Sequence, residues 1–241
     1  AEGYGGAIYQ STSGSITHCT FYGNAASTSG GALYVSAATT ISNTVFWGNT
    51  APSSPYISAA VVPTLYNCDT QTAWTATGSG NISSDPLLVN PSGNDYSLDY
   101  GSPCRNAGSV TYGAWDDING NPRFAAPDIG AYELRLMFVR KTASGSNNGS
   151  NWTNAFTEMR SATAIAISGD TIWVAAGTYT PHATDTSVYF TMKSSQKWYG
   201  GFAGTETLLS QRNPTANLTR LSGDLLGNDQ PNFVNYSDNS G

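Results

Sequence analysis

The chain has 241 residues, a formal net charge of −6 and only 11% charged residues, well below the roughly 25% typical of globular domains. Its 39% hydrophobic and 12% aromatic residues suffice for a packed core, which excludes a disordered chain, and the scarcity of Lys, Glu and Arg argues against a helical protein. No basic face is available for nucleic acid, and no apolar run is long enough to predict a membrane-spanning segment.

Two stretches near the N-terminus repeat each other. "GGAIYQSTSGSITHCTFYGNAA" (5–26) and "GGALYVSAATTISNTVFWGNTA" (30–51) share ten identities in 22 positions at an offset of 25, and a weaker third copy follows at an offset of 24. A fixed period of about 20–50 residues is typical of a solenoid. The short alternating β-prone runs, separated by Gly, Ser and Asn, indicate strands. The sequence therefore predicts a parallel β-helix with one repeat in each coil.

Equivalent residues of successive coils are expected to stack in columns. The alignment predicts an inward aliphatic column (Ile16, Ile41, Leu65), an inward aromatic column (Phe21, Phe46), a polar turn column (His18, Asn43, Asn67), a column of small side chains (Cys19, Thr44, Cys68), an outward aromatic column (Tyr22, Trp47) and corners at Gly23-Asn24 and Gly48-Asn49. A corner needs a positive φ or a side chain that bonds its own backbone, which Gly-Asn supplies. His18 and Cys19 are therefore interpreted as turn and packing residues, not as a metal site or a nucleophile. The outward aromatics either bind sugars or a neighbouring molecule, or simply pair across strands.

After residue 70 the repeat gives way to turn-rich sequence. We expect short strands at 87–89 and 96–98, and further on a short amphipathic helix from residue 153 to about 167. That helix would place Phe156, Met159, Thr163 and Ile165/Ala166 on one face and cap the first coil of a solenoid.

The turn-rich part also carries a family resemblance. "DPLLVNPSGNDYSLDYGSPCRNAG", "DINGNPR" and "DIGAYE" resemble the closing coils of bacterial cell-surface right-handed β-helix proteins, including the polymorphic outer-membrane-protein-like repeats. "SGDTIWVAAGTYTP" and the region from "WYGGFAG" to "SGDLLGND" resemble the opening coils. The resemblance implies an all-β, right-handed parallel β-helix located outside the cell or at its surface.

The resemblance covers nearly the whole chain, but in permuted order. Residues 1–136 correspond to central and closing coils of a module, and residues 137–241 to the cap helix and opening coils. Three explanations fit this order: a segment of a tandem array, a circular permutant, or the subunit of a head-to-tail fibre. In each case open coil ends would favour self-association.

Residues suited to catalysis are sparse in the repeated coils. Residues 5–70 contain one carboxylate, Asp69, and no Lys or Arg, whereas a lyase or hydrolase needs a carboxylate pair or calcium with a base. Two acidic clusters are candidates for structural calcium but are also ordinary turn sequences: Asp116, Asp117, Asn119 and Asn121, and Asp224, Asn228 and Asp229. Four arginines in turn-rich segments are expected to tie turns to the coils: Arg105, Arg123, Arg212 and Arg220.

The three cysteines, Cys19, Cys68 and Cys104, form neither a zinc motif nor an even disulfide set, so they do not define a redox compartment. The sequence as a whole predicts a non-enzymatic, extracellular structural or adhesive β-helix with no catalytic, cofactor-binding or metal-binding residues. The alternative is a carbohydrate-active β-helix, either lyase-like or polysaccharide-binding.

Overall fold

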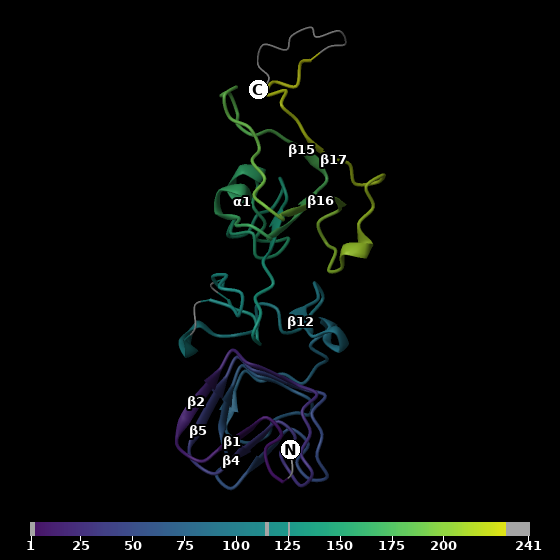
Figure 1. The fold of residues 1–241 in the computed structure, drawn as a ribbon. Helices are drawn as coiled ribbons and strands as arrows, with labels where there is room; N and C mark the ends of the chain where they lie inside the picture. The colour runs from purple at the N-terminus through teal and green to yellow at the C-terminus, as the bar shows by residue number, and fades with distance from the viewer. Residues whose placement is uncertain (1–2, 114–115, 125, 230–241) are drawn as a thin grey trace. The chain divides into compact units, whose positions relative to one another are not determined.

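The computed structural model describes residues 3–113, 116–124 and 126–229. The chain forms two compact units, Ala1–Leu134 (unit 1) and Arg135–Gly241 (unit 2). Both consist mainly of short strands paired in parallel, and the described residues include one α-helix (Figure 1). The predicted all-β solenoid with a short helix is confirmed.

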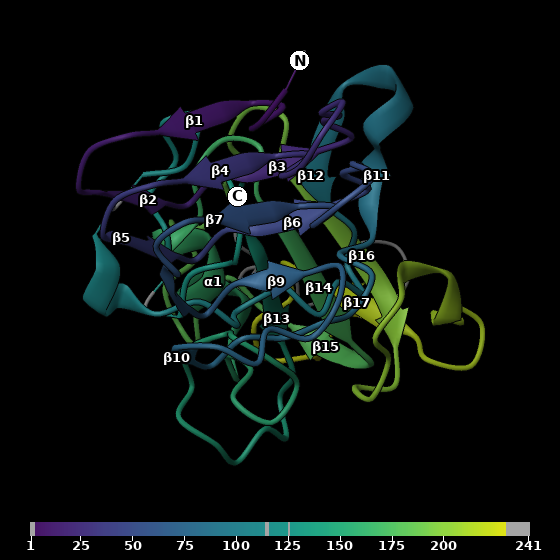
Figure 2. The same ribbon diagram turned by 90° about the horizontal axis from the view of Figure 1, so that it is seen from below.

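Unit 1 begins with three coils of three strands each. Coil 1 contains β1 (Ile8–Gln10), β2 (Gly14–Thr17) and β3 (Thr20–Tyr22); coil 2 contains β4 (Leu33–Val35), β5 (Thr39–Ser42) and β6 (Val45–Trp47); coil 3 contains β7 (Ile57–Ala59), β8 (Thr64–Tyr66) and β9 (Asp69–Thr70). Like strands stack in parallel as the sheets β1-β4-β7, β2-β5-β8 and β3-β6-β9, and β10 (Gly78–Ser79) extends the second of these. Figure 2 shows the coils from the side, with β1, β4 and β7 one below another.

The predicted inward columns are confirmed. Ile16 pairs with Ile41, and Ile41 with Leu65, while Phe21 pairs with Phe46. The two Phe rings stack with centroids 4.9 Å apart and an interplanar angle of 3°. Each fully buried aliphatic or aromatic side chain contributes about 1.5–3 kcal/mol, so these columns dominate the core of unit 1.

The corner columns adopt the backbone conformation that the sequence predicts. His18, Asn43 and Asn67 have φ values of 51°, 47° and 49°, and Gly23 and Gly48 both have 66°. Asparagine tolerates this left-handed region better than other non-glycine residues, which explains its repetition in the turn column.

The corner asparagine side chain, however, does not bond its own backbone as expected. The fully buried Asn49 accepts a hydrogen bond from the Asn24 backbone N–H (3.0 Å) and donates one to the Phe21 carbonyl (2.8 Å). The physical reason is that the corner of coil 1 lies directly beside Asn49 and offers a half-buried N–H and a buried C=O that need partners. Asn81 binds the Leu65–Cys68 corner in the same way.

Beyond the coils, the predicted strands at 87–89 and 96–98 are found within about one residue as β11 (Leu88–Asn90) and β12 (Asp95–Leu98). They form an antiparallel hairpin, not a further parallel coil. The linking residues include the 3₁₀ turn Pro91–Gly93 (η1), followed by Asn94 at φ 62°. So short a link can only reverse the chain, because a parallel crossover needs a dozen or more residues. A second 3₁₀ turn, η2, spans Val110–Tyr112.

Unit 2 contains a parallel three-stranded sheet and a parallel two-stranded sheet. The first has the order β13 (Leu136–Val139), β14 (Thr171–Ala175), β16 (Lys197–Phe202), and the second pairs β15 (Gly177–Tyr179) with β17 (Thr219–Leu221). Its aromatic core is centred on Trp173, which stacks on Phe202 (centroids 4.6 Å apart) and meets Phe138 edge-on. A 3₁₀ turn, η3 (Leu209–Gln211), precedes β17.

The helix α1 (Met159–Ile165) is shorter than the predicted segment 153–167. Met159 and Ala162 are buried as one face, whereas Ile165 is 50% exposed, so its assignment to the buried face was wrong. Phe156 is buried too, but it belongs to an extended segment that bridges Val139. The next residue on the packed face after Ala162 is Ala166, which was predicted together with Ile165 and is fully buried; Ile165, one position earlier, is turned toward solvent. The helix contacts β13 within unit 2.

Candidate functional site

The free edge of coil 1 is the most distinctive surface of unit 1. In the described residues, β1, β2 and β3 each pair on one side only, with β4, β5 and β6. Gly14 and His18 donate their backbone N–H groups to coil 2, at Ala38 and Ser42. The N–H groups of a strand alternate between its two sides, so those of Ser15 and Thr17 point away from coil 2 and face the free edge. A row of such groups is a template for another strand.

The hydrophobic columns also reach solvent at this edge. Ile41 and Phe46 are fully buried in coil 2, whereas Ile16 and Phe21 in coil 1 are 9% and 7% exposed. A groove of about 530 Å³ opens here, lined by Ile8, Thr17, His18, Cys19, Thr20, Phe21, Asp116, Asp117, Ile118, Arg123 and Ala131. Ile118, at its rim, is 67% exposed.

Three tyrosines form an exposed ladder on the β1–β4 face. Tyr9 stacks on Tyr34 with centroids 4.9 Å apart, and Tyr4 lies 5.0 Å from Tyr34. Tyr9 and Tyr4 are 58% and 51% exposed. Because the Tyr9 and Tyr34 rings follow each other along the stacking direction, one face of each ring covers the other. The tyrosine rings therefore lie one above another as a column and do not form a flat exposed surface.

The Tyr22 and Trp47 column, by contrast, is covered by the chain itself. Tyr22 and Trp47 are paired in register, as predicted, but the Tyr22 ring contacts Tyr96 of the β11–β12 hairpin (5.7 Å). Trp47 packs on a small second core around Val45, Leu98 and Ile129. The two aromatics therefore pair across strands, as the second alternative from the sequence predicted. Their contacts with the hairpin and with the second core were not predicted.

The polar turn column holds a strap, defined here as the described residues of segment 104–131. Asn67 donates to the Ala107 carbonyl, and Asn43 exchanges two 2.8 Å hydrogen bonds with the backbone of Ser109. Further along, the Ala131 N–H donates to the Thr20 hydroxyl of coil 1. The strap thus contacts coils 3 and 2 through residues that the sequence identified only as turn positions, and coil 1 through Thr20 of β3.

His18 lies in this column as a neutral imidazole. The Ser109 bonds fix which end of the Asn43 amide is the donor, so the second Asn43 N–H points to His18 Nε2 at 3.0 Å. His18 Nε2 must then accept, which places the proton on Nδ1. Burial lowers the pKa of His18 to about 4, and the positive charge of Arg123 contributes in the same direction. This geometry agrees with the interpretation of His18 as a turn residue.

Buried charges hold the end of the strap. Arg123 pairs with Glu133 at 3.2 Å, with side chains 3% and 0% exposed, and donates to the carbonyls of Gly130 and Ala131. Asp128 accepts backbone hydrogen bonds from Asn106 and Leu134, yet burial raises its pKa to about 7. Arg123 therefore ties one turn to another, whereas the sequence predicted that it would tie a turn to a coil.

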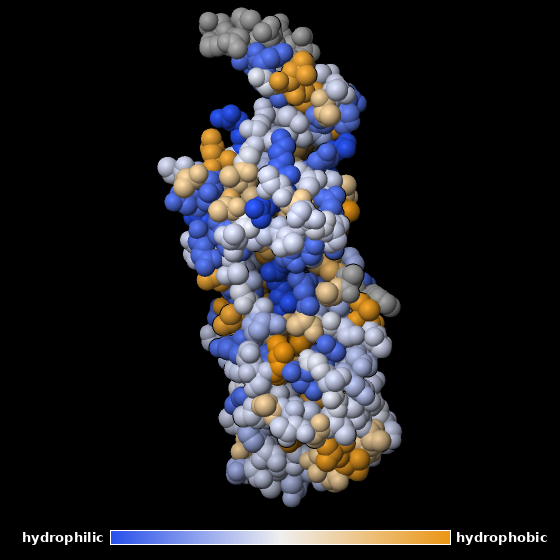
Figure 3. All heavy atoms as spheres, turned by 180° about the vertical axis from the view of Figure 1, so that it is seen from behind, coloured by the Kyte–Doolittle hydropathy of each residue, from blue (hydrophilic) through white to orange (hydrophobic). Residues whose placement is uncertain are grey.

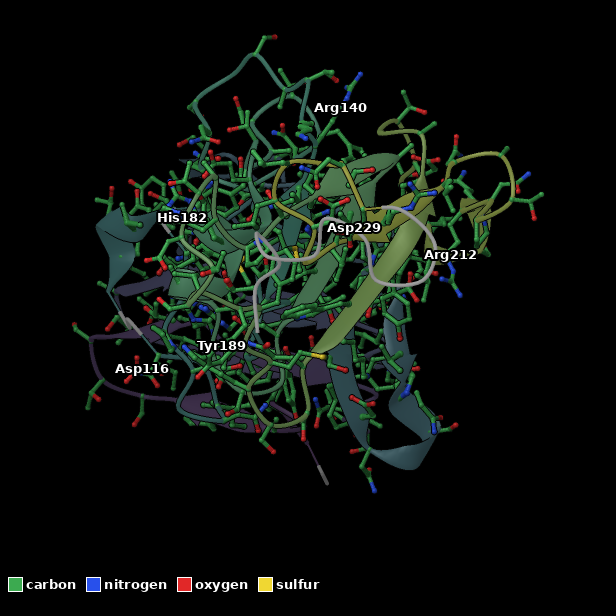
Figure 4. All side chains as sticks on the ribbon, turned by 90° about the horizontal axis from the view of Figure 1, so that it is seen from above. Asp116, Arg140, His182, Tyr189, Arg212 and Asp229 are labelled. Carbon is green, nitrogen blue, oxygen red and sulfur yellow. The ribbon has the colours of Figure 1, made fainter. Side chains whose placement is uncertain are left out.

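The other three arginines differ from one another. Burial lowers the pKa of Arg105, and the negative charge of Asp128 acts in the opposite direction. Arg212 is exposed, lies over the Tyr199 ring at 5.3 Å and bonds the Gly200 carbonyl (Figure 4). Arg220 is exposed within β17 and so lies in a strand, not in a loop. The prediction for Arg220 was wrong because β17 is too short to show a period in the sequence.

Both candidate calcium clusters are turns whose carboxylates bond the backbone. Asp117 accepts the N–H groups of Asn119 (2.8 Å), Asn121 (2.9 Å) and Glu133 (3.2 Å). Asp224 accepts those of Gly227, Asn228 and Asp229. Within residues 3–113, 116–124 and 126–229, no group of three or more His, Cys, Asp or Glu side chains is placed to hold a metal ion.

The cysteines are free thiols. Burial raises the pKa of Cys68 to about 12, and Cys104 donates its thiol to Asp69 Oδ2 at 3.1 Å. Burial raises the pKa of Asp69 to about 6. The Cys104–Asp69 pair joins the strap to coil 3, a long-range contact without a signal in the sequence.

Comparison with models of protein families, with curated proteins and with solved structures gives no match. The assignment to a β-solenoid therefore depends on the repeat and on the stacked parallel strands. In the described part of the chain, no helix combines the length and apolar character needed to cross a bilayer.

Proposed function

We propose that this chain is a structural, non-enzymatic segment of an extracellular β-solenoid assembly, in which the free edge of coil 1 pairs with a coil of another molecule. The observation that carries the proposal is the coil 1 edge itself: three strands with unpaired backbone groups surround a groove at the end of the hydrophobic columns. Pairing there would bury these groups and extend the columns by one coil.

The chemistry of the coil surface supports a structural role. Residues 3–68 contain no Asp, Glu, Lys or Arg. The strap brings Asp117 and Arg123 to the coil 1 groove, but Asp117 bonds three backbone N–H groups and Arg123 pairs with Glu133, which leaves these two groups committed to holding turns and not to acid–base catalysis. In Figure 3, the surface at the bottom of the picture, where Figure 1 draws the coils, is mostly pale apart from an orange patch, as expected for a surface rich in Ser, Thr, Gly and Ala. Such an uncharged, hydroxyl-rich surface suits a stiff rod outside the cell.

Sedimentation velocity over a range of concentrations tests the proposal. The wild-type protein is expected to form larger species as its concentration rises. Ser15→Pro removes one N–H from the free edge and leaves the bonds to coil 2 intact, so it is expected to weaken association about tenfold, whereas Ser15→Ala keeps the N–H and is the matched control. A protein that stays a single chain at all concentrations would contradict the proposed assembly, and cleavage of any polysaccharide would contradict the non-enzymatic role.

A further inference from the structure

Unit 2 has an open strand edge of its own. In the described residues, β16 pairs only with β14, and β17 only with β15. Gly177 donates to the Leu218 carbonyl, and Ser222 donates to the Tyr179 carbonyl. By the alternation of a parallel ladder, the N–H of Leu221 points away from β15, to the free edge. We call β16 and β17 with this face the β16–β17 edge.

A hydrophobic column also ends at the β16–β17 edge. Tyr179 is 2% exposed, and Leu221 lies beside it in register but is 43% exposed. Leu218 is 59% exposed next to the same strand. Leu221 is therefore placed as a core residue whose outer side has no coil to cover it. Coil 1 shows the same condition at Ile16 and Phe21.

The two edges are opposite in polarity. At the coil 1 edge, the partner strands come later in the chain, so the edge is the side on which an earlier coil would pair. At the β16–β17 edge, the partner strands come earlier in the chain, so the edge is the side on which a later coil would pair. A parallel stack therefore continues across two molecules only when the β16–β17 edge of one meets the coil 1 edge of the other. Two coil 1 edges related by a two-fold axis would instead pair antiparallel and bring like corners together.

Charge distinguishes these arrangements as well. Unit 1 has nine acidic and two basic residues, a net charge of −7, and unit 2 has seven acidic and eight basic residues, a net charge of +1. Asp116 is exposed at the coil 1 groove, while Lys197 and Arg220 are exposed on the β16–β17 edge (Figure 4 labels Asp116). At the edges themselves, the exposed Asp116 carboxylate is attracted by Lys197 and Arg220 and would be repelled by the Asp116 of a second coil 1 edge.

We infer that the partner of the coil 1 edge is the β16–β17 edge of a second copy of this chain, an inference that rests on the proposed function. The contact is heterologous: each molecule uses one edge to bind the molecule before it and the other to bind the molecule after it. Because such a contact does not close on itself unless a ring forms, it produces a filament of stacked coils.

The test mixes two variants that each lack one edge. Ser15→Pro blocks the coil 1 edge, and Leu221→Pro removes the free-edge N–H of β17 while sparing the bonds to β15. Ser15→Ala and Leu221→Ala are the matched controls, and circular dichroism with thermal melting checks that each variant is folded. If Leu221→Pro does not fold, Arg220→Glu replaces it, because it reverses an exposed charge on the same edge.

Sedimentation velocity then separates the outcomes. At a concentration where the wild type associates but a contact tenfold weaker does not form, the inference expects each variant alone to remain a single chain. An equimolar mixture is expected to form a species of two chains and nothing larger, since one intact junction remains. A two-chain species formed by either variant alone would overturn the inference, as would a mixture that stays a single chain while the wild type associates. A wild-type protein that never associates would instead remove the proposed function on which the inference rests.

Discussion

Asn49 offers the sharpest test of how neighbouring coils are held together. Its side chain is fully buried and satisfies two backbone groups of coil 1, the Asn24 N–H at 3.0 Å and the Phe21 carbonyl at 2.8 Å. It also accepts a bond from the Asn24 side chain at 3.0 Å. Asn49→Ala removes all three bonds and leaves the two backbone groups without these partners.

The size of the effect follows from those two groups. An unsatisfied buried donor or acceptor costs about 1–3 kcal/mol, so the sum is about 2–6 kcal/mol. Asn24 is only half-buried, and water reaching its N–H keeps the expected loss in the lower part of this range, about 2–4 kcal/mol. At about 2–4 °C per kcal/mol for a chain of this size, the melting temperature should fall by about 4–16 °C.

Urea unfolding followed by circular dichroism measures this loss, and Asn24→Ala is the control. Asn24 contributes one side-chain bond to Asn49, so its removal should cost only about 0.5–1.5 kcal/mol. Hydrogen exchange should show faster exchange of the Asn24 amide in Asn49→Ala. Equal destabilisation by the two variants would refute the reasoning that Asn49 acts by satisfying the neighbouring coil.

Three further predictions concern other parts of the fold. The pKa of His18 is lowered to about 4 from an ordinary 6.5. Its contribution to the free energy of unfolding is therefore present above pH 6.5 and is lost as the pH falls toward 4. The stability difference between wild type and His18→Asn should be constant above pH 6.5 and change in favour of the variant below it. A Cβ on Gly31 would lie 2.2 Å from the Pro55 carbonyl oxygen, so Gly31→Ala should lower the free energy of unfolding in urea by about 3 kcal/mol or more. Gly23 lies in open space at φ 66°, so Gly23→Ala should lower it by only about 1–2 kcal/mol. Because Asp117 bonds three backbone N–H groups, Asp117→Asn should lower the melting temperature equally with excess calcium or with EDTA; a calcium-dependent rise in the wild type would contradict this.

The coils could be predicted from the sequence because the residues that determine each coil lie within a single repeat. Strand alternation places Ile16 and Phe21 inside, and the period of 24–25 residues fixes which residues stack on them. The left-handed corners were also predictable, since Gly and Asn are the residues that tolerate them. These features are local and repeated, so a single sequence suffices to find them.

The strap and the candidate edges depend on contacts between distant residues. The bonds of Asn43 with Ser109 and of Cys104 with Asp69 join residues 66 and 35 positions apart. The cover over Tyr22 likewise comes from Tyr96, whose hairpin direction is set by the short turn before it. No periodic pattern records such contacts, and the position of Ile165 outside the helix contact shows the same limit for packing.

Cryo-electron microscopy of the concentrated protein tests the central claim of a head-to-tail stack most directly. The account predicts filaments in which the coil 1 strands of one molecule lie parallel to β16 and β17 of the next, continuing the strand spacing of about 4.8 Å across the junction. Single chains, or two-fold dimers with coil 1 edges in antiparallel contact, would contradict it.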